Sequence, residues 1–328
     1  DGAALHSVHM TQGRGAAAQD YRAPLFLAWQ ITNRCRGRCL HCCEESGPDK
    51  GWPDEMNREQ SLSLARQIAE MGIPYVAFGG GEPMGSPWIW DVFETLARGQ
   101  VEIKIETDGL LIGEAEADRL KDLNVACVQI SLDGAKAATH DALRPGGSFA
   151  GAVESFKRLV RRGLAPEWVF IPTRANLGEI ADAYAMAADL GARTFVTGPL
   201  MRLGRAARAW ESLAASEKEW RAAEEALRAR AAGVRNGPRL SIYPWGIQQE
   251  MLSRLESPQA MILVVPNGRA KLLNALPFAA ADLKTQSLAE GWQAAVKAWR
   301  NPTVKDFVAR AQTDPKLLLH ANECWDVS

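Results

Sequence analysis

Three of the six cysteines have a spacing that could bind a metal centre. Thiols occur at Cys35, Cys39 and Cys42, in a short segment where Gly37 allows the backbone to turn tightly. Structural zinc needs four ligands, whereas three thiolates leave one coordination position open, and thiolate-rich sites favour iron–sulfur clusters or zinc. The open position favours catalysis. Cys43 could supply a fourth sulfur, but adjacent residues rarely direct both side chains at one ion without strain, so we expect it to be a bystander.

A second group with chemical potential is the glycine run that ends in Glu82. A glycine run alone is most often a flexible turn. Here it directly follows a short apolar segment, 75–78, which is expected to be a strand. Glycines at the carboxyl end of a parallel strand let a ligand approach the backbone, and that edge is where α/β sheets bind ligands. The glycines and the cysteines are therefore expected to share one rim.

The elements that must position these motifs alternate between strand and helix. Short apolar segments and amphipathic helical patterns follow one another, and this alternation favours right-handed crossovers and a parallel sheet, without deciding between a barrel and an open sheet. The predicted strands are 25–31, 75–78, 101–106, 126–131, 168–172 and 193–197, and the clearest helices are 61–71, 114–122, 150–162 and 180–190.

The alternation breaks after about residue 203. Residues 207–232 are rich in Ala, Arg and Glu and predict a helix with a solvated face. Short strands at 239–242, 261–265 and 271–273 and helices at 288–299 and 304–311 are expected to follow. This pattern predicts a smaller α+β extension.

Composition and charge exclude several classes of protein. The chain has 328 residues, of which 47% are hydrophobic and 23% charged, which is typical of a globular protein. Its formal charge of −1 gives no field that would attract nucleic acid or an anionic membrane. No apolar run approaches the roughly 20 residues that cross a bilayer, and the first 20 residues lack the hydrophobic stretch of a secretory signal. We therefore expect no nucleic-acid or membrane partner.

The cysteine loop and the glycine segment, in this order after two successive strands, resemble motifs of the radical S-adenosylmethionine (radical SAM) superfamily. In that family the cysteines hold three irons of a single [4Fe-4S] cluster, and the glycine-rich segment contacts the methionyl amino group of S-adenosylmethionine (SAM). The resemblance implies that the metal ligands are Cys35, Cys39 and Cys42. It implies that the glycine-rich SAM contacts are Gly79, Gly80, Gly81 and Glu82.

The same resemblance implies the fold class: an α/β protein with a partial (β/α)6 barrel of the radical SAM type and a smaller α+β C-terminal extension. The expected parts are a polar N-terminal segment, 1–24, the radical SAM core, 25–206, and the extension, 207–328.

Further residues match the family at the ends of later strands. The segments 106–109 and 131–134 resemble its SAM-binding edges, which makes Thr107, Ser131 and Asp133 candidate SAM contacts. Either segment could instead be a turn whose side chains bond their own backbone. His41 stands where the family commonly has an aromatic residue near the adenine. Arg174 is a candidate partner of the SAM carboxylate, with a surface arginine as the alternative.

One branch of the family is the nearest match. The segment 140–149 resembles the branch that contains the pyrroloquinoline-quinone peptide enzyme and the sulfatase maturases. Members of this branch often carry auxiliary clusters in a cysteine-rich C-terminal region, but residues 207–328 contain only Cys324. We therefore expect a degenerate auxiliary-cluster domain without metal.

The resemblance implies reductive cleavage of SAM to methionine and a 5′-deoxyadenosyl radical that abstracts hydrogen from a substrate. The short sequence before residue 25 and the missing auxiliary clusters favour a small metabolite, such as a sugar, a nucleoside or a natural-product precursor. The alternative is radical modification of a precursor peptide or protein side chain. An alternative of another class is a non-enzymatic metal-binding module. An electron donor of the flavodoxin or ferredoxin type is implied as a partner, and the cytoplasm as the location.

The first prediction concerns Cys39. Replacing it (Cys39→Ala) removes one of three implied ligands, so the variant is expected to form no 5′-deoxyadenosine after anaerobic reduction with dithionite in the presence of SAM. Chromatography of the quenched reaction measures the product. Undiminished 5′-deoxyadenosine would contradict the assignment of Cys39.

Overall fold

The structure, a computed structural model, describes residues 18–327. The first 17 residues of the expected polar N-terminal segment lie outside the described residues.

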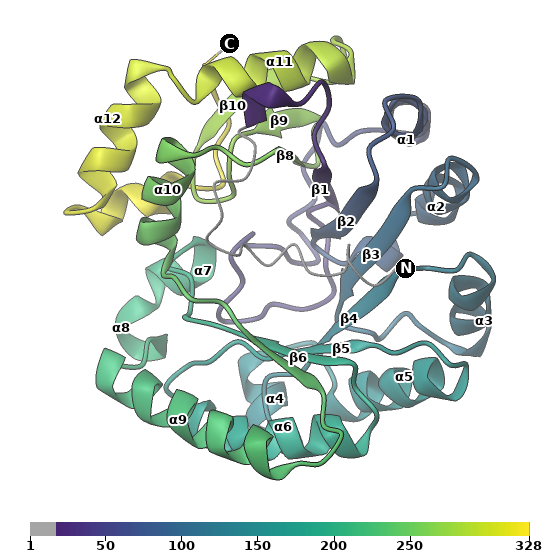
Figure 1. The fold of residues 1–328 in the computed structure, drawn as a ribbon, viewed down its shortest axis with the longest axis vertical. Coiled ribbons are helices and arrows are strands. Elements are labelled where there is room, and N and C mark those ends of the chain that lie inside the picture. Colours follow the sequence, from purple (N-terminus) through teal and green to yellow (C-terminus); the bar gives the residue numbers. More distant parts are fainter. Residues whose placement is uncertain (1–17, 328) are drawn as a thin grey trace.

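Six neighbouring parallel strands form the curved sheet at the centre of the molecule (Figure 1). Each strand pairs in parallel with the next one along the chain, which confirms the expected partial barrel. The strands are β1 (Phe26–Thr32), β2 (Tyr75–Gly80), β3 (Glu102–Thr107), β4 (Cys127–Ser131), β5 (Glu167–Val169) and β6 (Thr194–Thr197).

Helices cover the outer, convex face of this sheet (Figure 1). They are α1 (Arg58–Glu70), α2 (Ile89–Arg98), α3 (Glu114–Asp122), α4 (Ala137–Leu143), α5 (Phe149–Arg161) and α6 (Ile180–Asp189). Asn57 caps the start of helix α1: its side chain accepts a hydrogen bond from the backbone N–H of Gln60 in a complete capping box. The sequence pattern did not predict α2 or α4.

Aromatic side chains fill the space between sheet and helices. Trp168 on β5 is fully buried, with its ring centroid 6.0 Å from that of Phe156 on α5 and 6.3 Å from that of Phe195 on β6. Its indole N–H donates to the carbonyl oxygen of Leu132 at 2.8 Å. This contact fixes the loop that follows β4, at the carboxyl end of the sheet.

The chain after residue 206 extends the same sheet at both edges. Strand β7 (Arg239–Ile242) pairs in parallel with β6, and β8 (Met261–Val264) pairs in parallel with β1. Strands β9 (Arg269–Lys271), β10 (Phe278–Asp282) and β11 (Trp325–Asp326) continue beyond β8, so that the described residues form one 11-stranded sheet. The domain boundary at residue 206 stays a prediction.

The predicted helix over 207–232 is divided into three in the structure. These are α7 (Gly204–Arg208), α8 (Trp210–Leu213) and α9 (Glu217–Gly233), and the division before α9 occurs where Ser216 caps the new helix. The remaining helices are α10 (Ile247–Glu256), α11 (Leu288–Ala298) and α12 (Pro302–Ala311). Strand β10 went unpredicted because its three consecutive alanines carry little strand preference.

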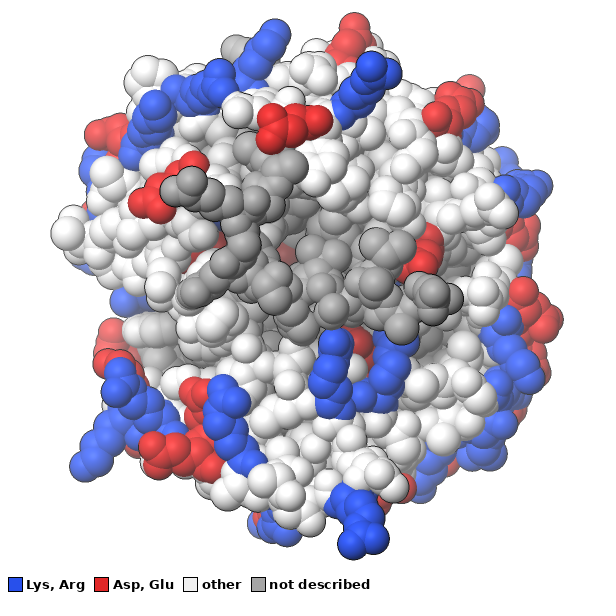
Figure 2. All heavy atoms as spheres, viewed as in Figure 1, with Lys and Arg blue, Asp and Glu red and all other residues white. Residues whose placement is uncertain are grey.

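Charges of both signs are mixed on the surface. On the face in Figure 2, Lys and Arg side chains stand among Asp and Glu side chains around the rim, in keeping with the formal charge of −1. Within residues 18–327, no helix has the length and the apolar character that a bilayer crossing requires.

The second prediction concerns the aromatic core. Trp168→Ala leaves a cavity and an unpaired carbonyl at Leu132, and is expected to lower the free energy of unfolding by about 3–5 kcal/mol. The shift of the urea midpoint measures it. Trp325→Ala is the matched control, since that ring is 37% exposed, and its midpoint is expected to move much less. Equal shifts would contradict this description of the core.

Candidate functional site

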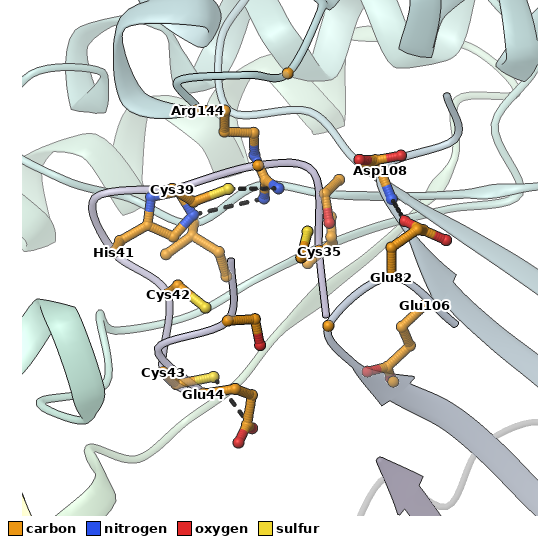
Figure 3. A pocket seen from close by; sticks show the side chains of 18 of the residues that line it. Cys35, Cys39, His41, Cys42, Cys43, Glu44, Glu82, Glu106, Asp108 and Arg144 are labelled. Atoms are coloured by element: carbon orange, nitrogen blue, oxygen red, sulfur yellow. Dashed lines mark hydrogen bonds between the residues drawn. The ribbon is translucent and has the colours of Figure 1, made fainter. Parts of the chain in front are cut away.

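A cavity of about 350 Å³ opens at the carboxyl ends of the parallel strands (Figure 3). All three cysteines of the predicted metal loop line it, as do the three glycines, 79–81, at the end of β2. The shared rim expected from the sequence is therefore present. The other candidates in its wall are His41, Glu82, Thr107 and Ser131.

The cysteine loop follows β1 and has no helix or extended strand of its own. The thiols of Cys35 and Cys39 both lie close to Gly37, because a Cβ atom built on that glycine would be 3.7 and 3.6 Å from their sulfur atoms. Among residues 18–327, no three Cys, His, Asp or Glu side chains form a binding site for a single metal ion. A cluster that takes one thiolate on each of three irons does not require its ligands to converge on one ion.

The thiols of Cys35 and Cys39 ionise less readily than a solvent-exposed cysteine. Burial raises the pKa of Cys35 to about 12, and burial also raises the pKa of Cys39, against the opposing effect of the Arg144 charge. Thiolates, not thiols, bind metals, so metal binding at this loop has to displace protons.

Distant parts of the chain hold the loop through its backbone carbonyls. Arg205 donates twice, from its backbone N–H to the oxygen of Cys42 at 3.0 Å and from Nε to the oxygen of Cys39 at 2.7 Å. Asn322 donates from Nδ2 to the oxygen of Cys43 at 2.8 Å. Gly204 has a φ of 52°, and a Cβ atom there would lie 2.7 Å from the oxygen of Cys42. Only glycine permits this approach.

The last two glycines of the run pack against the base of the loop. The N–H of Gly81 donates to the oxygen of Thr32 at 2.8 Å, and a Cβ atom on Gly81 would overlap the carbonyl group of Arg34. Gly80 has a φ of 99°. Gly79 differs, since its nearest neighbour is a carboxylate oxygen of Glu106, 3.3 Å from a notional Cβ. Close backbone packing, and not only space for a ligand, therefore explains why positions 80 and 81 are occupied by glycine.

Glu82 joins the ends of β2 and β3. Its buried carboxyl group accepts hydrogen bonds from the Thr107 hydroxyl at 2.7 Å, from the backbone N–H of Asp108 at 3.0 Å and from that of Met84 at 3.1 Å. Burial and the negative charge of Asp108 raise the pKa of Glu82 to about 8. Both Glu82 and Thr107 line the cavity, but their mutual bond makes them part of its frame.

Asp133 is the centre of a buried ionic group behind the cavity wall. One carboxylate oxygen accepts from Arg144 Nε at 2.5 Å and lies 3.1 Å from His41 Nε2, and the other accepts from the N–H of Ile171 at 2.8 Å. Burial alone would raise the pKa of Asp133, but the charges of Arg144 and His41 hold it well below its usual value. Asp133 therefore positions the two side chains that reach the cavity.

Arg144 presents its guanidinium group to the cavity. Its Nη1 atom lies 3.6 Å from the sulfur of Cys39, and Nη2 lies 3.5 Å from His41 Nε2 (Figure 3). Arg144 lies in the segment 140–149, whose resemblance to the family branch implies no role for this residue. Its position four residues after His140, before Pro-Gly-Gly, was the available signal. His140 is neutral near pH 7, because burial lowers its pKa to about 4, and its Nδ1 accepts from the N–H of Asp133 at 3.0 Å.

The structure does not bring Arg174 to the other candidates. This side chain is exposed, is absent from the cavity wall and donates to the oxygen of Glu211 at 3.0 Å. The backbone turns after β5, where the N–H of Thr173 donates to the side chain of Asn176 at 2.6 Å. The structure therefore gives no support to the expected role of Arg174 at a carboxylate, and the arginines that line this cavity are Arg144 and Arg205.

Cys43 also lines the cavity, and its thiol has a partner of its own. Its sulfur donates to Glu44 Oε1 at 3.5 Å, as Figure 3 shows. The expectation that Cys43 is a bystander to metal binding stays a prediction.

Comparison with known proteins assigns residues 29–184 to the radical SAM superfamily. The chain is 37% identical over 192 residues to "Mycofactocin maturase MftC" of Mycobacterium ulcerans, covering 58% of this chain and 51% of that protein. It is 26% identical over 227 residues to "Sporulation killing factor maturation protein SkfB" of Bacillus subtilis, covering 69% of this chain and 54% of that protein. The chain thus spans about half the length of the curated relatives it matches.

A solved structure of Streptococcus suis SuiB bound to S-adenosylmethionine is similar in fold. Its TM-score is 0.70 at 13% identity, covering 91% of this chain and 72% of that one. SuiB has also been solved with its precursor peptide SuiA.

The third prediction tests how the cysteine loop is held. Arg205→Ala removes a charged donor from the oxygen of Cys39, which is worth about 1.5–3 kcal/mol and hence about tenfold or more in local opening. Trypsin is expected to cut the metal-free variant after Arg36 or Arg38 about ten times faster than the parent chain. Mass spectrometry of the fragments measures it.

Arg202→Ala is the matched control. Arg202 lies in the same segment, but its guanidinium stacks on Trp210, 5.1 Å from the ring centroid. Equal cleavage of the Arg205 variant and this control would show that Arg205 does not hold the loop.

Proposed function

The chain carries a radical SAM domain, and we propose that it binds one [4Fe-4S] cluster and SAM at the carboxyl-end cavity in order to modify a peptide. The observation that carries this proposal is the joint presence of Cys35, Cys39, Cys42 and the glycine run in one cavity wall. When bound, the cluster and SAM supply one-electron cleavage of SAM, which starts hydrogen abstraction from the substrate.

The chain's own groups supply binding and orientation. We assign Cys35, Cys39 and Cys42 to the cluster, because these three of the four thiols on one backbone-held loop have the spacing of the motif that the chain resembles. We assign the SAM carboxylate to Arg144 in place of Arg174. The Arg144 guanidinium is held by Asp133 at 2.5 Å, so it can donate hydrogen bonds to a bound carboxylate without reorienting. Gly79 and Ser131 line the same cavity and are the remaining candidates for direct contact with SAM.

Two further groups act as positioning residues. Glu82 fixes the ends of β2 and β3 through Thr107 and Asp108, and His41 is held against Asp133 at 3.1 Å, 7% exposed. Neither group has to move to form the cavity, so the site is pre-organised for its cofactors. His41 is placed beside the cysteine loop, where contact with the adenine of SAM is proposed.

The similar proteins favour a peptide substrate over the small metabolite expected first. MftC and SkfB carry names as maturation proteins, and SuiB has been solved with a precursor peptide. We therefore adopt the alternative reading of the sequence. The C-terminal extension, with Cys324 as its sole cysteine, is proposed to work without an auxiliary cluster.

The proposal also includes an electron-donor partner and a location. A flavodoxin or ferredoxin would supply the low-potential electron. The cytoplasm, as a reducing compartment, suits the oxygen-sensitive cluster.

The fourth prediction tests substrate class. The chain with its cluster rebuilt anaerobically is incubated with SAM and dithionite, in one arm with synthetic copies of short peptides encoded beside its gene and in the other with a metabolite extract. The proposal predicts that 5′-deoxyadenosine accumulates as the mass of one peptide changes, and that Cys39→Ala abolishes both changes.

Each other outcome contradicts a defined part of the proposal. Loss of a small metabolite with unchanged peptides would restore the first expectation. No 5′-deoxyadenosine in either arm would favour the non-enzymatic metal-binding module.

A further inference from the structure

A second cavity of about 460 Å³ lies at the same rim of the sheet. Its wall comes from the segments that follow β5, β6 and β7, and from α8 and the start of α9. Pro199 and Leu200, in the segment after β6, line both this cavity and the one that contains the cysteines. The two cavities are therefore neighbours across a single stretch of backbone.

The lining of the second cavity is dominated by rings. Trp210, Trp220 and three prolines contribute to it, and Leu200, Ala214 and Ala215 add aliphatic surface. Surfaces built from tryptophan and proline are those on which proteins commonly bind proline-containing or aromatic stretches of polypeptide.

The charged residues in this wall already have partners. Glu217 pairs with Arg221 at 2.5 Å, and Glu224 pairs with Arg228 at 2.6 Å, each one turn along α9. Within each pair the two charges cancel, so neither pair adds a net charge beside the cavity. The cavity wall thus combines rings and aliphatic side chains with ion-paired charges, groups that also occur together around side-chain anchors in protein interfaces.

We propose that the second cavity binds an aromatic or proline side chain of the polypeptide substrate, while the residue to be modified lies in the cysteine-lined cavity. This inference rests on the proposed function, because it requires a peptide substrate. An extended chain advances about 3.3–3.6 Å per residue, so a peptide that reaches from one cavity to its neighbour needs only a few residues between the reacting side chain and the anchoring ring.

The size and position of the cavity match this use. Ligand cavities commonly measure about 300–1,000 Å³, and one of about 460 Å³ holds a single large side chain with its flanking backbone. A small metabolite confined to the first cavity would leave the second one without a function, whereas a polypeptide has to continue beyond the reacting residue. Because Pro199 and Leu200 line both cavities, the second cavity is placed to bind the part of the polypeptide that continues beyond the reacting residue.

The experiment measures peptide binding, separately from catalysis. The full chain, with its cluster rebuilt and SAM present, is immobilised and offered a displayed library of random linear peptides 12 residues long. Affinities of the enriched peptides are then measured for the parent chain and for three variants: Trp220→Ala, which removes a ring from the wall, Ala215→Trp, which fills the cavity, and Trp90→Ala, the control.

These variants separate loss of the subsite from loss of the fold. Trp220 also packs against the core, but Ala215→Trp keeps that packing and still occupies the space. Trp90 is likewise half-buried and lies on α2, where its ring stacks with Arg119 at 4.4 Å, outside the wall of either cavity. Thermal melting of each variant verifies that it is folded.

The fifth prediction is that enriched peptides share an aromatic residue or proline at one position. Their affinity is expected to fall at least tenfold in Trp220→Ala and in Ala215→Trp, and to stay unchanged in Trp90→Ala. Failure to enrich any peptide, absence of a shared ring residue, or equal affinity for Ala215→Trp and the parent chain would overturn the inference. Peptides that bind in this way but are not modified with SAM and dithionite would contradict the proposed function and leave the binding site supported.

Discussion

A loop without regular secondary structure has to hold three thiols in fixed positions, and the rest of the site depends on how its backbone is restrained. The restraints come from four places in the chain. Its base is bonded to the glycine run through Thr32 and Gly81, and Arg38 donates its N–H to the oxygen of Pro145 at 2.7 Å. Arg205 and Asn322 bind its carbonyl oxygens from the C-terminal side. The barrel and the chain beyond it are therefore both needed to position the thiols.

The buried charges beside the cavity are also held by specific contacts. A carboxylate with 0% exposure is costly unless every lone pair is matched, and Asp133 meets this condition with Arg144, His41 and the backbone of Ile171. The result is a guanidinium group that cannot swing away from Cys39. Positive charge is thereby fixed beside the loop in the metal-free chain, before any anionic group binds.

The sequence predicted local features well. The strand that leads into the cysteines and the parallel sheet both follow from short-range patterns, and the structure confirms them. The cavity wall also contains most of the candidate residues, because strands that run in parallel end at one edge.

The features that the sequence did not predict depend on long-range contacts. The carboxylate of Asp133 decides that the guanidinium of Arg144 turns inward, because it contacts Arg144 and not Arg174, and this contact joins separate segments of the chain. Likewise, the pairing of β7 and β8 with opposite edges of the sheet depends on where distant strands end. The spacing of apolar residues and the composition predict the type of each segment, but they do not predict which segment packs beside it.

Electron paramagnetic resonance of the full chain, rebuilt with iron and sulfide under anaerobic conditions and reduced with dithionite, tests the central claim most directly. The account predicts the signal of one reduced [4Fe-4S] cluster, with a line shape that changes when SAM is added. A chain that acquires no such signal, or whose signal is the same with and without SAM, would contradict the assignment of the cysteine loop and its open coordination position.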